Sequence, residues 1–221
     1  MRGGGNRFVR WPWTGLQSQP SIRTVFVKRG RNILTKAARL TGSVALGWVV
    51  LANIPDVHAF RRAAIDQLLE TGKCLRCDLR GASLAQKNLR GVDLSGAYLI
   101  GANLETADMR GANLSGARLV RANLRHASLA GASLLGAHLI DADLTGADLR
   151  KANLRDSMLA RAELTNANLD GAALSGANMQ GTKLFRVKGL AQDQLSASCG
   201  GADTNLPRGL SIQVCTEGRK Q

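Results

Sequence analysis

The chain has 221 residues, of which 44% are hydrophobic and only 4% aromatic, and it carries a formal net charge of +14. Aromatic side chains normally supply much of the area buried in a globular core, so their scarcity argues against a broad core and leaves Leu and Ala to fill a narrow interior. The charge is uneven, because residues 1–59 hold nine Lys/Arg and one acidic residue, whereas residues 77–186 hold 13 basic and 10 acidic residues. The central part therefore lacks the clustered positive charge typical of a nucleic-acid-binding domain, and we expect no nucleic-acid partner.

Residues 1–59 are predicted to be a basic N-terminal extension that includes a signal peptide. An apolar run at residues 41–52 follows a cluster of five basic residues, and Val57-His58-Ala59 supplies a small–x–small pattern that predicts cleavage after Ala59. A membrane-spanning helix needs about 20 apolar residues, so this run is short for a span. The alternatives are an uncleaved N-terminal membrane anchor or a basic arm. The basic residues are Lys28, Arg29, Arg31, Lys36 and Arg39.

Residues 60–76 are predicted to form a helix and a cysteine-containing junction. An apolar stripe of four residues recurs at helical spacing over residues 60–71, and Gly72 provides a stop signal. We expect this helix to cap the region that follows. The stripe consists of Ala64, Ile65, Leu68 and Leu69.

A five-residue repeat occupies residues 77–186 in 22 consecutive units. The third position is Leu in 20 units and Met in the other two, the first position is Ala in 17, and the fifth is Gly in 12. The second position is usually Asp, Asn or Ser. On an α-helix, leucines five residues apart would be distributed over all sides of the helix. On a strand they would alternate between its two faces. Each unit must therefore contain a turn, which Gly and Asp or Asn favour.

Strings such as A-N-L-S-G at residues 112–116 and A-D-L-T-G at residues 142–146 resemble the pentapeptide-repeat family closely. The resemblance covers half of the chain and implies an all-β solenoid, a right-handed quadrilateral β-helix with four units per coil and about five and a half coils. The third-position residues and the first-position alanines would point inward. Lys87 occupies such an inward position, and we expect a local distortion there. The predicted core includes Leu79, Leu84, Leu89, Leu94, Leu99, Leu104, Met109, Leu114, Leu119, Leu124, Leu129 and Leu134.

The C-terminal segment 187–221 has lost the repeat and is predicted to cap the last coil. Residues 189–198 read as a short helix, and the string C-G-x-x-x-T-x-L-P-x-G-L that follows resembles tails of other exported pentapeptide-repeat arrays. The four cysteines, an even number in a chain predicted to be exported, suggest disulfides. Three connectivities are possible for Cys74, Cys77, Cys199 and Cys215, and pairing Cys74 with Cys77 and Cys199 with Cys215 is the most local. Zinc binding and redox catalysis are disfavoured because a second C-x-x-C is absent.

Residues 20 apart should stack on one face if four units form a coil. One face then carries an outward set of apolar residues, which we call the candidate interface: Tyr98, Ile100, Val120, His138, Ile140 and Met158. Three interpretations remain open, namely a site for a partner or for self-association, a surface covered by the C-terminal tail, or a simple strand preference for β-branched residues. A second face carries Arg90, Arg110 and Arg150 beside Asn or Asp, which predicts a solvated face of mixed charge.

The sequence predicts a protein without enzymatic activity. His126 and His138 fall on different faces, and no phosphate loop, carboxylate pair or metal cluster is recognisable, so we expect no cofactor and no metal. The leading hypothesis is a structural or protein-interaction scaffold in the periplasm, or in another extracytoplasmic space such as the lumen of a photosynthetic membrane. The alternatives are a mimic of duplex DNA that binds a type II topoisomerase, which a mildly basic body disfavours, and an adaptor anchored to the membrane.

Overall fold

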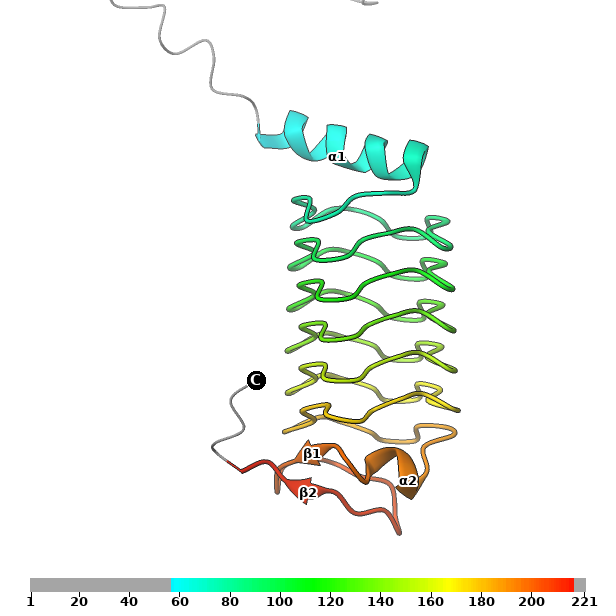
Figure 1. The fold of residues 1–221 in the computed structure, drawn as a ribbon, viewed down its shortest axis with the longest axis vertical. Helices are drawn as coiled ribbons and strands as arrows, with labels where there is room; N and C mark the ends of the chain where they lie inside the picture. The colour runs from blue at the N-terminus through cyan, green and yellow to red at the C-terminus, as the bar shows by residue number, and fades with distance from the viewer. Residues whose placement is uncertain (1–56, 217–221) are drawn as a thin grey trace, which may run out of the picture. The chain divides into compact units, whose positions relative to one another are not determined.

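The computed structural model describes residues 57–216 (Figure 1). Helix α1 (Val57–Thr71) precedes a stack of coils, and α2 (Gln192–Leu195), β1 (Cys199–Gly200) and β2 (Gln213–Val214) follow it. Helix α1 starts before the expected residue 60 and ends at the expected residue 71. None of the helices in this part of the chain is long and apolar enough to span a membrane. The basic cluster and the apolar run of the predicted signal peptide lie outside the described residues.

The coils are joined by a parallel hydrogen-bond ladder with a step of 20 residues, which equals four five-residue units. Tyr98, for example, forms parallel bridges with Asp78 and with Arg118. The Leu99 N–H donates to the carbonyl of Arg118 at 2.8 Å, and the Gly101 N–H donates to that of Val120 at 2.9 Å. Because each unit bonds to the coils on both sides, its backbone polar groups are paired without long strands.

Each unit ends in a corner whose fifth residue adopts the left-handed conformation, as at Gly101 with φ 64°. The Ala102 N–H then donates to the Leu99 carbonyl at 3.0 Å and closes the turn. Residues other than glycine adopt the same conformation, including Thr106 at φ 55°, although it is unfavourable for L-residues. Second-position Asn and Asp side chains support the segment before the corner, since the Asn113 Oδ1 accepts the Ser115 N–H at 3.1 Å.

The interior is a single column of Leu, Met and Ala. The twelve predicted core residues, from Leu79 to Leu134, all have 0% exposure, and first-position alanines are buried with them. Full burial of one leucine contributes about 1.5–3 kcal/mol before the cost in conformational entropy. One coil cannot enclose its own leucines, so stability depends on stacking.

Lys87 does not point inward as its position in the repeat suggested. Its side chain is exposed, because a buried, unpaired ammonium would be strongly destabilising. The corner hydrogen bond from the Lys87 N–H to the Leu84 carbonyl is 3.3 Å long, and the bond from the Val92 N–H is 3.5 Å, against 3.0 Å at Ala97. The expected distortion is therefore confirmed, but it is confined to the corner, because the neighbouring inter-coil bond from Leu89 to Asp108 is 2.7 Å long.

Helix α1 lies over the first coil (Figure 1). Leu68 and Ala64 are buried against the coil stack and Ile65 is partly buried, but Leu69 is 45% exposed, so the expectation of a four-residue packed stripe was wrong at that residue. Coil pairing already begins at Gly72, whose carbonyl accepts the Asp93 N–H at 2.8 Å. Residues 72–76 thus act as an additional unit, five residues before the expected start.

The C-terminal segment replaces the next coil at the other end of the stack. Helix α2 is shorter than the expected 189–198, and its Leu195 is 1% exposed against the last leucines. The side-chain amide of Gln194 donates to the carbonyls of Leu169 and Ala172 at 2.9 and 2.8 Å. Strand β1 bridges to Asn178 and pairs in parallel with β2. The tail therefore satisfies backbone groups that the end of the ladder would leave unpaired.

Candidate functional site

The six residues of the candidate interface lie on one face in consecutive coils. Second-position residues of this face follow one another in a single ladder of bridges from Asp78 to Asn178. Tyr98, Ile100 and Met158 are 37%, 36% and 36% exposed, and the other three residues are partly buried. The spacing of 20 residues predicted from the repeat therefore places aromatic, aliphatic and thioether side chains on one face, with Arg118 between Tyr98 and His138.

Charged side chains lie within this row and beside it. The guanidinium of Arg118 lies 5.1 Å from the centre of the Tyr98 ring, within the range of a cation–π contact. At the adjacent corner Arg161 forms an ion pair with Asp141 at 2.7 Å. The hydrogen bonds from Arg161 hold the pKa of the Asp141 carboxyl below its usual value. The pair is exposed to solvent, so its main effect is to fix the position of both charges.

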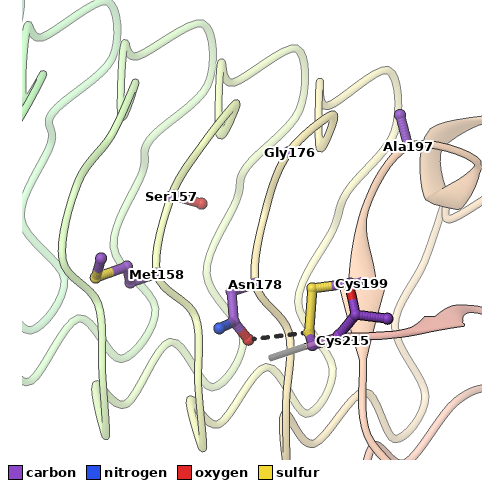
Figure 2. Close-up of a pocket in the computed structure, with 8 residues that line it drawn as sticks. Ser157, Met158, Gly176, Asn178, Ala197, Cys199 and Cys215 are labelled. Atoms are coloured by element: carbon purple, nitrogen blue, oxygen red, sulfur yellow. Dashed lines mark hydrogen bonds between the residues drawn. A yellow bond between two sulfur atoms is a disulfide. The ribbon is translucent and has the colours of Figure 1, made fainter. Parts of the chain in front are cut away.

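The C-terminal tail reaches one end of the candidate interface. Met158, Asn178 and the disulfide between Cys199 and Cys215 line a hollow of about 220 Å³ there (Figure 2). The Asn178 Oδ1 lies 3.6 Å from the Cys215 sulfur. Up to Thr216 the tail thus contacts only the Met158 end, and Ile100 keeps its exposure.

The cysteines form two local disulfides, Cys74–Cys77 and Cys199–Cys215. The first lies where α1 joins the coils. The second links β1 to the residue that follows β2, and so ties the tail to the end of the stack. Within residues 57–216 no cluster of His, Cys, Asp and Glu is arranged to hold a metal ion.

The arginine face is a row of local ion pairs. Arg110 pairs with Asp108 at 2.5 Å and Arg150 with Asp148 at 2.7 Å, while the Arg90 N–H donates to the Asn88 side chain. The hydrogen bonds from Arg110 lower the pKa of Asp108 to about 2, although partial desolvation opposes the shift. This agrees with the predicted solvated face of mixed charge, because two of the three arginines are already engaged by a carboxylate.

The two histidines of the coils, His126 and His138, do not form a dyad. His138 belongs to the candidate interface, whereas His126 is a left-handed corner residue whose ring lies over Gly146. A Cβ added at Gly146 would lie 2.5 Å from the His126 Nδ1. His126 therefore packs along its own corner and not against His138.

A groove beside the candidate interface was missed by sequence reasoning. It has a volume of about 670 Å³ and runs along the corner that bears Gly96 and Gly116. The spacing of these glycines by 20 residues was a signal that could have revealed it, since glycines at one corner leave a channel between two faces. The side chains beside this corner are Leu75, Arg76, Ser95, Tyr98, Ser115 and Arg118.

Comparisons with known proteins agree with the repeat pattern. The family model for pentapeptide repeats matches eight copies, over residues 77–116, 117–156 and 147–188. No curated protein matches the chain.

The 36 matching chains of solved structures include the following three pentapeptide-repeat proteins. HetL, which is involved in heterocyst differentiation regulation in the cyanobacterium Nostoc sp. strain PCC 7120, is 29% identical over 61% of this chain and 78% of its own, with a TM-score of 0.33. Rfr23 of the cyanobacterium Cyanothece 51142 is 27% identical over 66% of this chain and 99% of its own, with a TM-score of 0.34. A protein of the Arabidopsis thaliana thylakoid lumen is 31% identical over 55% of this chain and 85% of its own, with a TM-score of 0.28.

Proposed function

Because this chain belongs to the pentapeptide-repeat family, whose members fold as right-handed quadrilateral β-helices, we propose that it is a non-catalytic scaffold that binds a protein through the candidate interface. The observation that carries this proposal is the exposure of Tyr98, Ile100 and Met158 in one row on one face. Other large exposed apolar residues of the coils, such as Leu135 and Phe185, lie on other faces. A continuous apolar surface marks interaction sites more often than scattered apolar residues do.

Strand preference alone accounts for only part of this surface. β-Branched residues suit outer strand positions, which explains Val120 and Ile140. The preference extends to Tyr98 but does not explain Met158, which lies in the second position where most units carry Asp, Asn or Ser. The candidate interface thus departs from the repeat in residue type as well as in exposure.

We propose that the protein works in an oxidising space outside the cytoplasm, with the periplasm as first choice. Two disulfides support this, because they persist in oxidising compartments. Cleavage after Ala59 would shorten α1 at its start but keep Ala64 and Leu68, the helix residues packed on the coils. N-terminal sequencing of protein from cells should find Phe60 as the first residue, whereas an intact basic arm would favour a membrane-anchored adaptor.

We also propose that α1 and the tail are caps. Leu68 and Leu195 are 0% and 1% exposed, so each end of the leucine column is covered. The Gln194 amide blocks two carbonyls at the end of the ladder. Covered ends keep the coil stack from extending into a second molecule.

The interface proposal is tested by a double substitution, Ile100→Lys with Ile140→Lys. It places two ammonium groups on the apolar row, and we expect it to abolish recovery of the partner in a cross-linking pull-down from the native compartment. The matched control is Thr145→Lys with Thr165→Lys, which adds the same charge at β-branched fourth positions of another face. Unchanged recovery and unchanged oligomeric state in the Ile100/Ile140 variant would refute the proposal. A change in oligomeric state alone would identify the partner as a second copy.

A further inference from the structure

Two guanidinium groups flank the groove beside the candidate interface, those of Arg76 and Arg118. Neither forms an ion pair with any carboxylate in residues 57–216, in contrast to Arg80, Arg110, Arg125, Arg150 and Arg161. What distinguishes Arg76 and Arg118 from other unpaired arginines is their place, since both line the same groove.

The corner glycines create the groove, and one of them determines where the Arg76 side chain lies. At Gly116 an added Cβ would meet nothing within 4 Å, so no side chain fills the groove at this glycine. At Gly96 an added Cβ would lie 3.1 Å from the Cγ of Arg76, so the Arg76 stem lies across the bare glycine backbone. The absence of a side chain at Gly96 thus lets Arg76 extend along the corner toward Ser115 and Arg118.

The second arginine is oriented by an aromatic ring. The Arg118 guanidinium sits 5.1 Å from the Tyr98 ring centre, which restricts its rotamers but leaves its N–H donors available. A planar guanidinium held in this way suits bidentate binding of a carboxylate. Because the restriction exists before binding, less side-chain entropy is lost when a ligand arrives.

The acids beside the groove do not neutralise it. Asp78 lines an adjoining hollow of about 320 Å³ with Arg76, Arg80 and Tyr98. It is bound to Arg80 by two hydrogen bonds of 2.8 and 2.6 Å. The charges of Asp78 and Arg80 cancel. Asp93, whose carboxylate accepts the N–H of the groove residue Ser95 at 3.0 Å, offsets one of the two positive charges of Arg76 and Arg118, so the groove keeps a net positive charge.

We propose that this groove selects a peptide segment of the partner that is both acidic and apolar. Its carboxylates would bind Arg76 and Arg118, and its apolar side chains would lie against Leu75, Tyr98 and Ile100. Leu75 is 60% exposed and Tyr98 37% exposed, so both offer apolar area to a ligand. A second copy of the chain fits less well, because groove-to-groove contact about a two-fold axis would oppose like charges. The inference rests on the proposed function and names the chemistry of the partner.

The experiment uses the immobilised full-length chain and a phage-displayed library of random dodecapeptides. Selected sequences should be enriched in Asp and Glu next to Leu, Ile or Phe. The most frequent peptide, labelled with fluorescein, is then titrated by fluorescence anisotropy. Arg118→Glu and Arg76→Glu should each weaken its binding by about tenfold or more, and added salt should weaken binding to the unsubstituted protein.

Arg90→Glu is the matched control, since Arg90 is exposed and lies on another face without an ion pair among the described residues. It should leave the affinity unchanged. Enrichment of neutral or basic peptides, no enrichment, or equal affinity for the Arg118→Glu protein would overturn the inference. So would a labelled DNA duplex that competes with the peptide at equal concentration, because the groove would then bind phosphate generally. These results leave the pull-down with the Ile100/Ile140 variant unaffected, so the two proposals can fail separately.

Discussion

The interior and the outer faces of the coil stack follow different rules. Inside, each of the four sides presents the same residues, with Leu or Met at every third position and mostly Ala at every first position. Outside, one face is apolar, another is a row of Asp–Arg pairs, and one corner carries unpaired guanidiniums beside glycines. The repeat therefore accounts for the fold, whereas recognition depends on the outer residues that vary from unit to unit.

The largest effect is expected from the interior. Leu129 is fully buried in the middle of the stack. Leu129→Ala removes its contacts and leaves a cavity that stacked backbones cannot collapse to fill, so the free energy of unfolding should fall by about 2–5 kcal/mol. Urea denaturation followed by circular dichroism measures it. A loss below about 1 kcal/mol would mean that the interior is far more plastic than its burial indicates.

A smaller effect is expected at the corners, where interior and exterior meet. Gly136 has φ 61°, and an added Cβ would meet nothing within 4 Å, so Gly136→Ala introduces backbone strain without a clash. We expect a loss of about 1 kcal/mol. Thr106→Gly removes a β-branched residue from the same conformation and should stabilise the protein by a similar amount. Thermal unfolding of both variants tests this, and shifts of the same sign would contradict the strain argument.

The charged face should respond to pH. The pKa of Asp108 is about 2 in the folded protein and higher in the unfolded chain, so its contribution to stability is complete above about pH 4 and is lost as the pH falls toward 2. Asp108→Asn removes this contribution, which for an exposed pair is below about 1 kcal/mol. The difference in unfolding free energy between the two proteins should therefore shrink on acidification. A difference that is constant from about pH 6 to pH 2 would show that the pair contributes nothing.

The smallest effect on stability is expected on the apolar face. Ile140 is only partly buried and its side chain points outward, so Ile140→Lys should change the free energy of unfolding by about 0.5 kcal/mol or less. The same substitution contributes to the loss of binding expected of the Ile100/Ile140 variant. A large destabilisation would instead show that Ile140 stabilises the fold, as an interior residue does, and would contradict the proposed difference between the interior and this outer face.

The coils could be predicted from the sequence because a strict period of five admits few backbone solutions. The inward leucines, the left-handed corners and the Asn and Asp turns all follow from it. The distortion at Lys87 could also be predicted, because burying its charge would cost far more than a small distortion of one corner. The packing of Leu69 was predicted wrongly, because helix periodicity identifies the side of the helix that faces the coils but not how many residues on that side are buried.

The ends and the groove were harder to predict for physical reasons. Beyond residue 188 the pattern is lost, and the path of the tail depends on long-range contacts such as those of Gln194 with Leu169 and Ala172. The groove depends on pairs of residues from adjacent faces, Arg76 and Arg118, which a search along single faces does not combine. Stacking the corners at 20-residue intervals would have aligned Gly96 with Gly116.

The 20-residue step of the ladder has a consequence for how such a protein can change in evolution. Duplicating four units inserts a whole coil and leaves every downstream residue on its own face, so the apolar row simply becomes longer. Losing a single unit turns all later units by one side, which would move Ile140 and Met158 to the face next to that of Ile100. Insertions and deletions of four units, or of a multiple of four, preserve a binding surface. Any other number of units divides the surface between two faces, although the leucine column remains intact.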